Sequence, residues 1–390
     1  MIAYDTVWLD NLAAREAIKD AFDEDCISKE EKEVSGSIFP VGFYSPNLFI
    51  QIGLFILTLV IACFSLGLLG LLIIDGIFGS LEKTIGGLLI FLGILSYIAL
   101  EFFVRSKDHY RSGVDDALLY IAGICLVGGI CALYNISSPK VNILLIFIFA
   151  AYFFLRFTDM VMCAIAGLTL VATFFFYYSP LGEMAKATTP FLIMIVTTLL
   201  YFVIKGISKQ NNMRHYRHCA MVLEITMLVC FYAASNYFVV REMSISMFDL
   251  DLKENESIPF GWLFWIFTVV IPLVYIFAGV QKKDAVLLRV GLIAVAAIVF
   301  TVRYYHTVLP VEIVMLLGGM ILITVSYALT KYLASPKKGF TSAELSKRFL
   351  MDKMNIEALV IAETFGNTVP ANDTKFGGGS FGGGGASGEY

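Results

Sequence analysis

Residues 48–74 read LFIQIGLFILTLVIACFSLGLLGLLII, a run with the length and the apolar character of a membrane-crossing helix. About 20 residues at 1.5 Å per residue cover the roughly 30 Å hydrocarbon core of a bilayer. Lipid offers no hydrogen-bond partners to backbone amides, so such a run must be helical. The pattern recurs, and ten runs are predicted to be spans: 48–74, 81–104, 114–134, 141–155, 160–178, 188–207, 219–240, 260–280, 285–302 and 308–333.

The composition of the whole chain agrees with this interpretation. Hydrophobic residues make up 58% of the 390 residues and charged residues 15%, against about 45–50% and about 25% in soluble domains. No basic block suits nucleic acid, and the acidic N-terminus is not typical of a cleaved signal peptide. The seven cysteines lie mostly in apolar runs, as small hydrophobic residues rather than a disulfide framework. The predicted fold is all-α, a polytopic transmembrane helical bundle of about ten spans.

The fourth and fifth runs allow two interpretations. The fourth, 141–155, is short, and only Arg156-Phe157-Thr158-Asp159 separates it from the fifth. The two runs form either a tight helical hairpin or a re-entrant pair. Either alternative changes the number of crossings by an even number, so every later span keeps its side of the membrane.

The distribution of Lys and Arg predicts the orientation. Alternate joints between the runs are rich in basic residues, and the end of the tenth run adds three more. The positive-inside rule places these joints in the cytoplasm, together with both termini. The basic residues in question are Arg105, Lys107, Arg111, Arg156, Lys205, Lys209, Arg214, Arg217, Lys282, Lys283, Lys331, Lys337 and Lys338.

Polar and Gly-rich segments flank the bundle. Ser28-Lys29-Glu30-Glu31 has the spacing of a capping box and predicts a helix start. After the bundle, apolar residues recur at helical spacing, and the final stretch is too rich in glycine to repay its ordering entropy. Four segments are predicted: a cytoplasmic helical hairpin (1–46), the transmembrane bundle (47–334), a cytoplasmic amphipathic helix (335–366) and a flexible Gly-rich tail (367–390).

Two charged residues fall inside predicted spans. Glu224 in the seventh run and Arg289 in the ninth both lie roughly 10 Å from the cytoplasmic side. Equal depth would allow an ion pair, which would offset the cost of burying each charge. A functional interpretation is a polar pathway in which Glu224 titrates. The structural alternative, a fixed pair or two side chains that reach water separately, is favoured because one acid and one base do not make a pathway.

Closer to the interface, Glu101 and Arg105 are four residues apart, and Arg156 and Asp159 are three apart. Both spacings bring side chains together on a helix. We interpret both as interfacial ion pairs whose aliphatic stems lie in the membrane.

On the opposite side of the membrane, four residues could form a small polar pocket for an anion or a proton: Arg241, Arg303, His306 and Glu312. Pro310 suits a first helical turn, and Glu312 would lie near the positive end of that helix dipole. The alternative is an aromatic belt beside a capped helix, and it is favoured.

Motifs for catalysis or cofactor binding are not found. The stretch His215-Tyr-Arg-His218-Cys219 has no second ligand cluster, whereas a zinc site needs three or four converging ligands. No phosphate-binding Gly loop, nucleophile elbow, zinc-protease helix or kinase motif is present. We therefore expect no metal, no cofactor and no enzymatic activity.

Two stretches carry a resemblance to a known family. They are Trp8-Leu9 through Cys26-Ile27-Ser28-Lys29-Glu30-Glu31, and Arg303-Tyr304-Tyr305-His306 followed by Leu316-Leu317-Gly318-Gly319. They resemble the bacterial membrane proteins called domain of unknown function 2157, over most of the chain. The ending GGGSFGGGGASG (377–388) is similar to tails of membrane-anchored proteins of Bacteroidetes. The resemblance implies a polytopic inner-membrane protein without an assigned activity, and it supplies no catalytic residues.

Three functions remain open from the sequence. The leading hypothesis is a non-enzymatic scaffold of the bacterial inner membrane, with membrane-protein partners bound through the cytoplasmic hairpin and the C-terminal tail. The alternative is a secondary transporter, in which two blocks of five spans have inverted topology and Glu224 and Arg289 line a polar pathway. An enzyme acting on lipid-linked substrates is the least favoured, because intramembrane acid and histidine clusters are lacking.

Overall fold

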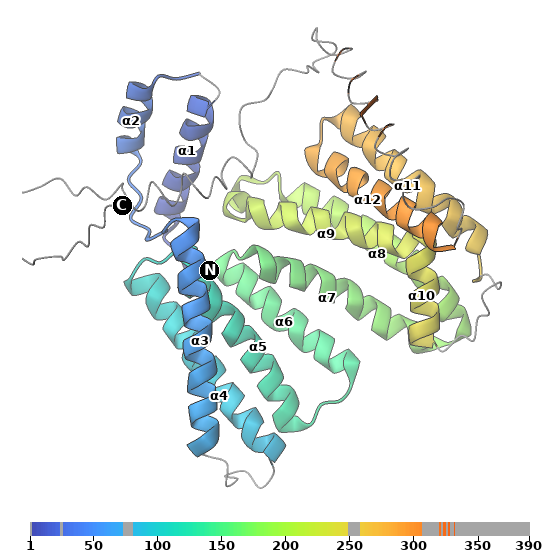
Figure 1. Ribbon diagram of the computed structural model, residues 1–390, viewed down its shortest axis with the longest axis horizontal. Helices are drawn as coiled ribbons and strands as arrows, with labels where there is room; N and C mark the ends of the chain where they lie inside the picture. The colour runs from blue at the N-terminus through green and yellow to red at the C-terminus, as the bar shows by residue number, and fades with distance from the viewer. Residues whose placement is uncertain are drawn as a thin grey trace, which may run out of the picture. The chain divides into compact units, whose positions relative to one another are not determined.

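The computed structural model describes residues 2–23, 26–72, 81–248 and 258–305, together with Met320, Ile323, Thr324, Tyr327 and Lys331. Within these residues the chain forms twelve α-helices and no β-strand, which confirms the predicted all-α fold (Figure 1). In chain order the helices are α1 (Thr6–Asp23), α2 (Lys29–Ile38), α3 (Leu48–Leu72), α4 (Leu81–Ser106), α5 (Val114–Tyr134), α6 (Pro139–Phe157), α7 (Met160–Tyr178), α8 (Glu183–Ile207), α9 (Arg217–Ser235), α10 (Tyr237–Phe248), α11 (Gly261–Lys282) and α12 (Ala285–Tyr305).

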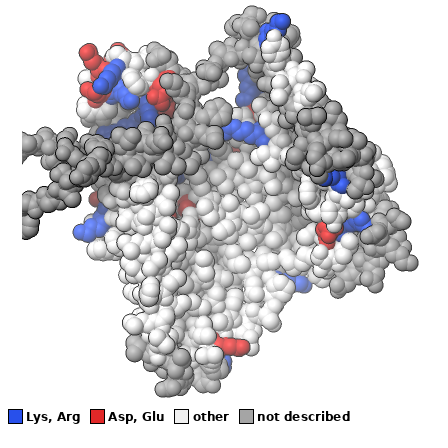
Figure 2. Space-filling model, viewed as in Figure 1, with Lys and Arg blue, Asp and Glu red and all other residues white. Residues whose placement is uncertain are grey.

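Nine of these helices are long and apolar enough to cross a bilayer: α3 to α9, α11 and α12. Figure 2 shows a broad uncharged area on this face, with most of the charged side chains near the edges of the view. The protein is therefore a multi-pass integral membrane protein. The predicted runs 114–134 and 160–178 coincide with α5 and α7. The tenth run lies almost wholly outside the described residues, and the predicted C-terminal helix and tail lie entirely outside them.

The chain divides into two compact units, one of residues 1–18 and 33–317 and one of residues 19–32 and 318–390. In the second unit, the backbone N–H of Ser28 donates to Glu31 Oε2 (2.8 Å) and that of Glu31 donates to Ser28 Oγ (3.2 Å). This reciprocal pair is the predicted capping box, and α2 begins beside it, at Lys29.

The fourth and fifth runs form two complete helices. α6 and α7 contain 19 residues each, or about 28 Å, and they pack side by side. α6 begins two residues earlier than predicted because Pro139 suits a first turn, where its missing N–H costs nothing. α6 ends where Thr158 adopts a left-handed backbone with φ 51°. The tight hairpin is the alternative that fits these helices.

The N-terminal segment contacts three joints that the sequence analysis assigned to one side of the membrane. The N–H of Ala3 donates to the carbonyl of Arg156 at 2.8 Å, and that of Tyr44 donates to the carbonyl of Asp108 at 2.9 Å. Asp10 of α1 accepts a hydrogen bond from Arg214 at 2.5 Å. These contacts place the joints after α4, α6 and α8 at one end of the bundle, which we call the N-terminal end.

Glycine allows two neighbouring spans, α4 and α5, to approach closely. A Cβ added at Gly129 would lie 2.8 Å from the backbone nitrogen of Ile90 and 2.9 Å from the carbonyl oxygen of Gly86. Such contacts with backbone atoms cannot be relieved by a rotamer change. Gly128, the adjacent residue, has no atom within 4 Å of an added Cβ. Small residues at helix contacts are a common device for packing within lipid.

We predict that Gly129→Ala lowers the free energy of unfolding by about 1–3 kcal/mol, because it overpacks the contact between α4 and α5. Gly128→Ala is the matched control and should leave stability unchanged or slightly raised. The measurement is thermal unfolding of both purified variants in the same detergent. Equal midpoints for the two variants would contradict the close approach at Gly129.

Candidate functional site

The seventh predicted run is two helices in the structure. α9 ends at Ser235 and α10 begins at Tyr237. Between them, Asn236 has an extended backbone (φ −82°, ψ 126°). Its Oδ1 accepts hydrogen bonds from the N–H groups of Phe238 (3.0 Å) and Val239 (3.3 Å), so Asn236 acts as the N-cap of α10. The hydropathy pattern missed this helix break, although an N-cap residue type inside an apolar run is a usable signal.

A buried polar network surrounds the helix break. Asn236 Nδ2 donates to the hydroxyls of Tyr232 and Thr301, both at 3.1 Å. The N–H of Tyr237 donates to Thr268 Oγ1 at 2.9 Å. These hydrogen bonds link the helix break to α11 and α12, and each of the three donor groups has a partner.

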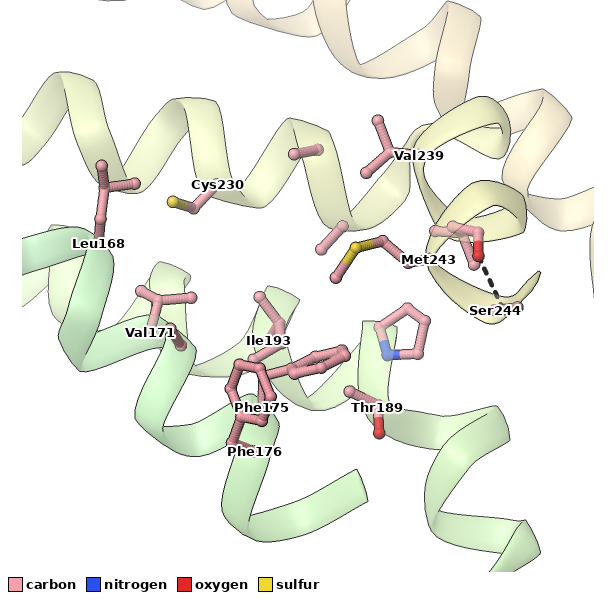
Figure 3. Close-up of a pocket in the computed structure, with 15 residues that line it drawn as sticks. Leu168, Val171, Phe175, Phe176, Thr189, Ile193, Cys230, Val239, Met243 and Ser244 are labelled. Carbon is pink, nitrogen blue, oxygen red and sulfur yellow. Dashed lines mark hydrogen bonds between the residues drawn. The ribbon is translucent and has the colours of Figure 1, made fainter. Parts of the chain in front are cut away.

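An apolar groove of about 240 Å³ lies beside the helix break, between α7, α8, α9 and α10 (Figure 3). Figure 3 shows side chains of all four helices facing this space. We call it the α7–α10 groove. Its lining residues are Leu168, Val171, Ala172, Phe175, Phe176, Thr189, Pro190, Ile193, Cys230, Ala233, Ala234, Val239, Val240, Met243 and Ser244.

The two hydroxyls in the lining are already bonded within their own helices. Thr189 donates to the carbonyl of Ala185 and Ser244 to that of Val240, both at 2.7 Å. The groove therefore offers almost no hydrogen bond to an occupant. It can hold hydrocarbon, and it gives no preference to a polar molecule or an ion.

The structure does not bring together the residues predicted for an outer polar pocket that it describes. Arg241 is buried, and its guanidinium lies 5.2 Å from the ring centroid of Tyr305. Arg303 is exposed at the end of α12. His306 and Glu312 lie outside the described residues, so the pocket they would complete stays a prediction. What the structure places around Arg241 is an aromatic cluster, in which Tyr237 stacks on Trp265 at 4.8 Å.

Glu224 and Arg289, the predicted intramembrane pair, lie on α9 and α12. Glu224 is half-buried and Arg289 is exposed. Among the described residues, no ion pair joins the two. The charged groups that interact electrostatically with Glu224 are instead Lys205 and Asp284.

Lys205 and Asp284 form an ion pair that the sequence analysis missed. Lys205 Nζ lies 2.5 Å from Asp284 Oδ2 and 2.9 Å from the hydroxyl of Tyr201. Asp284 also accepts hydrogen bonds from the N–H groups of Val286 and Leu287 at the start of α12. Burial raises the pKa of Asp284, but the hydrogen bonds from Lys205 and the backbone outweigh it, so this pKa lies below its ordinary value. The pair therefore joins the C-terminal end of α8 to the residue that precedes α12.

One of the two predicted interfacial pairs is confirmed and the other is wrong. Arg105 Nε lies 2.9 Å from Glu101 Oε2, as the spacing predicted. Arg156 does not bind Asp159, but instead places its Nε 2.9 Å from Glu101 Oε1. The reason is the left-handed Thr158, which ends α6 and turns Asp159 away. A three-residue spacing brings side chains together only within one helix, and α6 ends between Arg156 and Asp159.

Asp159 instead caps the next helix. It accepts a hydrogen bond from the N–H of Met162 at 2.7 Å and one from the hydroxyl of Tyr120 at 3.2 Å. Burial raises the pKa of Asp159, although the hydrogen bonds oppose this rise. Asp115 lies in the first turn of α5 and binds the preceding joint, where it accepts hydrogen bonds from the backbone N–H groups of Arg111 and Ser112, both at 2.8 Å.

The stretch around His215 and Cys219 has no converging ligands. His215 Nε2 lies 3.7 Å from Asp10, and the buried Cys219 thiol donates to the carbonyl of Thr158 at 3.3 Å. Across the residues that the structure describes, no three His, Cys, Asp or Glu side chains are arranged to bind a metal ion.

These features define the class of the chain, a polytopic α-helical membrane protein with a broken helix beside an apolar groove. Comparison with models of known protein families gives no match for the chain, and neither do comparisons with curated proteins and with solved structures. The resemblance to domain of unknown function 2157 therefore stays a prediction.

We predict that Asn236→Ala lowers the free energy of unfolding by about 2–4 kcal/mol, because it removes the N-cap of α10 and leaves buried partners unsatisfied. Asn236→Ser should cost less, because its hydroxyl can still cap the helix. The measurement is thermal unfolding in detergent, with tryptophan fluorescence as a second signal because Trp265 stacks on Tyr237.

Ser244→Ala is the control for this series, because the Ser244 hydroxyl bonds only within α10. It should unfold at the wild-type midpoint. The role assigned to Asn236 would be contradicted if the Ala and Ser variants were both as stable as this control.

Proposed function

We propose that the protein is a non-enzymatic scaffold of the bacterial inner membrane that binds partner proteins on its cytoplasmic surface. The observation that carries this proposal is the attachment of the N-terminal segment to the joints after α4, α6 and α8. The three contacts come from Ala3, Asp10 and Tyr44, so they fix the parts of this segment that belong to the first unit. A surface that is already fixed binds partners at a lower entropic cost.

The end of α2 supports the proposal, because it is held in place and yet carries exposed apolar side chains. Arg15 Nε donates to the carbonyl of Phe39 at 2.7 Å, and Asn11 Nδ2 donates to that of Pro40 at 2.8 Å. Val34 and Ile38, four residues apart on α2, are 63% and 66% exposed. Apolar side chains fixed on an otherwise charged helix are typical of a protein–protein contact.

We predict that a photo-crosslinking amino acid at position 34 or 38 forms one discrete protein adduct in intact cells. Ile124 on α5 is 73% exposed on a candidate span and serves as the lipid-facing control position. The adduct protein, once identified, should co-purify with the wild-type chain. It should be lost with the double variant Val34→Asp/Ile38→Asp, which exchanges apolar contacts for charge without touching the bundle.

The variant must reach the membrane at the wild-type level and unfold at the wild-type midpoint. Adducts with lipid alone from positions 34 and 38, or co-purification that the double variant leaves intact, would refute the scaffold proposal.

A secondary transporter is the second candidate, and one observation favours it. Discontinuous helices beside a cavity are a recurrent feature of transporter binding sites, and α9–α10 is such a helix. The apolar lining of the groove favours the scaffold, because it offers no site for an ion or a polar solute. Solute flux in a deletion strain distinguishes the two: a transporter requires a flux that Glu224→Gln or Arg289→Ala changes, whereas the scaffold proposal predicts no such flux.

A further inference from the structure

The N-terminal end of the bundle contains a second cavity, of about 360 Å³, between α1, the start of α3 and the joints before α5 and α9. We call it the α1 cavity. Unlike the α7–α10 groove, it has polar and apolar walls in similar measure. Its lining residues are Leu9, Asp10, Leu12, Ala13, Glu16, Ser45, Pro46, Gln51, Tyr110, Arg111, Arg214, His215 and His218.

We propose that the α1 cavity binds a group that carries both a phosphate and an amine, the chemistry of an aminophospholipid headgroup. Such a group can come from a membrane lipid or from a soluble phosphoamine. The cavity is within the size range of small-molecule sites, and three features of its walls favour this chemistry.

The first feature is the position of the cavity beside a span. Ser45, Pro46 and Gln51 line the cavity, and α3 begins at Leu48. The wall therefore includes the first turn of a membrane-crossing helix, the level at which lipid headgroups lie. Basic pockets at the ends of spans are a known mode of headgroup recognition.

The second feature is a basic, an imidazole and an acidic side chain that form no ion pair with the described residues. Among the described residues no ion pair involves Arg111, His218 or Glu16, and all three are exposed. The Arg111 guanidinium lies 5.4 Å from the ring of Tyr110, an arrangement that leaves its N–H groups available. A guanidinium and an imidazole bind phosphate oxygens, and a carboxylate binds an ammonium group.

The third feature is that the remaining charges in the wall are balanced. Asp10 binds Arg214 at 2.5 Å and lies 3.7 Å from His215. A phosphate alone would leave Glu16 facing an anion, whereas an amine beside the phosphate pairs with this carboxylate. The charge pattern thus favours a zwitterion over an anion.

Apolar residues of α1 complete the cavity. Leu9, Leu12 and Ala13 line it beside the polar groups. A headgroup with its attached glycerol would meet both kinds of surface, since a lipid is apolar where it joins its chains.

The test is the thermal stabilisation of the full chain in detergent by added short-chain phosphatidylethanolamine, phosphatidylglycerol or free phosphoethanolamine. A ligand that binds only the folded state raises the unfolding midpoint as its concentration passes the Kd. Phosphatidylethanolamine should stabilise the wild type, and phosphatidylglycerol should not do so to the same extent. Stabilisation by free phosphoethanolamine as well would support the site and assign a soluble source.

Glu16→Gln and His218→Gln change exposed side chains, so both variants should fold, and each should raise the Kd about tenfold by removing a charged hydrogen bond. Arg111→Gln should raise it at least as much. Arg217→Gln, next to His218 at the start of α9 but outside the lining, is the matched control and should bind as the wild type does.

Equal stabilisation of the wild type by phosphatidylethanolamine and phosphatidylglycerol would overturn the proposal. So would Kd values in Glu16→Gln and His218→Gln that match the Arg217→Gln control, because the lipid would then act through the detergent belt and not through the cavity.

Discussion

The hydrogen-bonding demand of the backbone in hydrocarbon is the constraint on which the rest of this structure depends. The apolar runs that the structure describes satisfy it by forming helices, and each helix end must satisfy it again with a side chain or at the membrane surface. Asn236, Asp159 and Asp284 each accept backbone N–H groups at the start of a helix. These three polar side chains are therefore explained first by the helix starts that they satisfy, and not by a binding or catalytic role.

Charge follows the same logic at the N-terminal end of the bundle. The acidic residues before α7 and α12 lie at helix starts, where the helix dipole favours a negative charge. The basic residues of the joints then pair with carboxylates, as Arg156 does with Glu101 and Lys205 with Asp284. The polar cavity at this end and the apolar groove beside α10 thus lie in different chemical surroundings, and each suits a different kind of occupant.

The sequence was sufficient for most of the fold because membrane helices follow from local hydropathy. The runs 114–134 and 160–178 coincide with α5 and α7, and the Ser28–Glu31 capping box is formed. The helix break at Asn236 was missed because the apolar residues on both sides conceal one polar residue from an averaged pattern. A search for N-cap residue types within long apolar runs would have found it.

The candidate sites could be predicted less well, because ion pairs depend on which helices are neighbours. Equal depth in the membrane suggested an ion pair between Glu224 and Arg289. In the structure, α8 packs against α9, and this packing brings Lys205 near Glu224. The pairing of Arg156 with Glu101 joins residues 55 positions apart, which no local spacing can reveal. The groove and the α1 cavity are likewise made by three or more elements, so they have no signature in the sequence.

The most direct test of the account is the membrane topology of two joints on opposite sides of the bundle. Alkaline phosphatase or green fluorescent protein would be fused after Ser137, between α5 and α6, and after Lys209, between α8 and α9. The account predicts an active phosphatase at Ser137 and a fluorescent protein at Lys209, because the basic joint stays in the cytoplasm. An active phosphatase at Lys209 would contradict both the orientation and the cytoplasmic surface on which the proposed function depends.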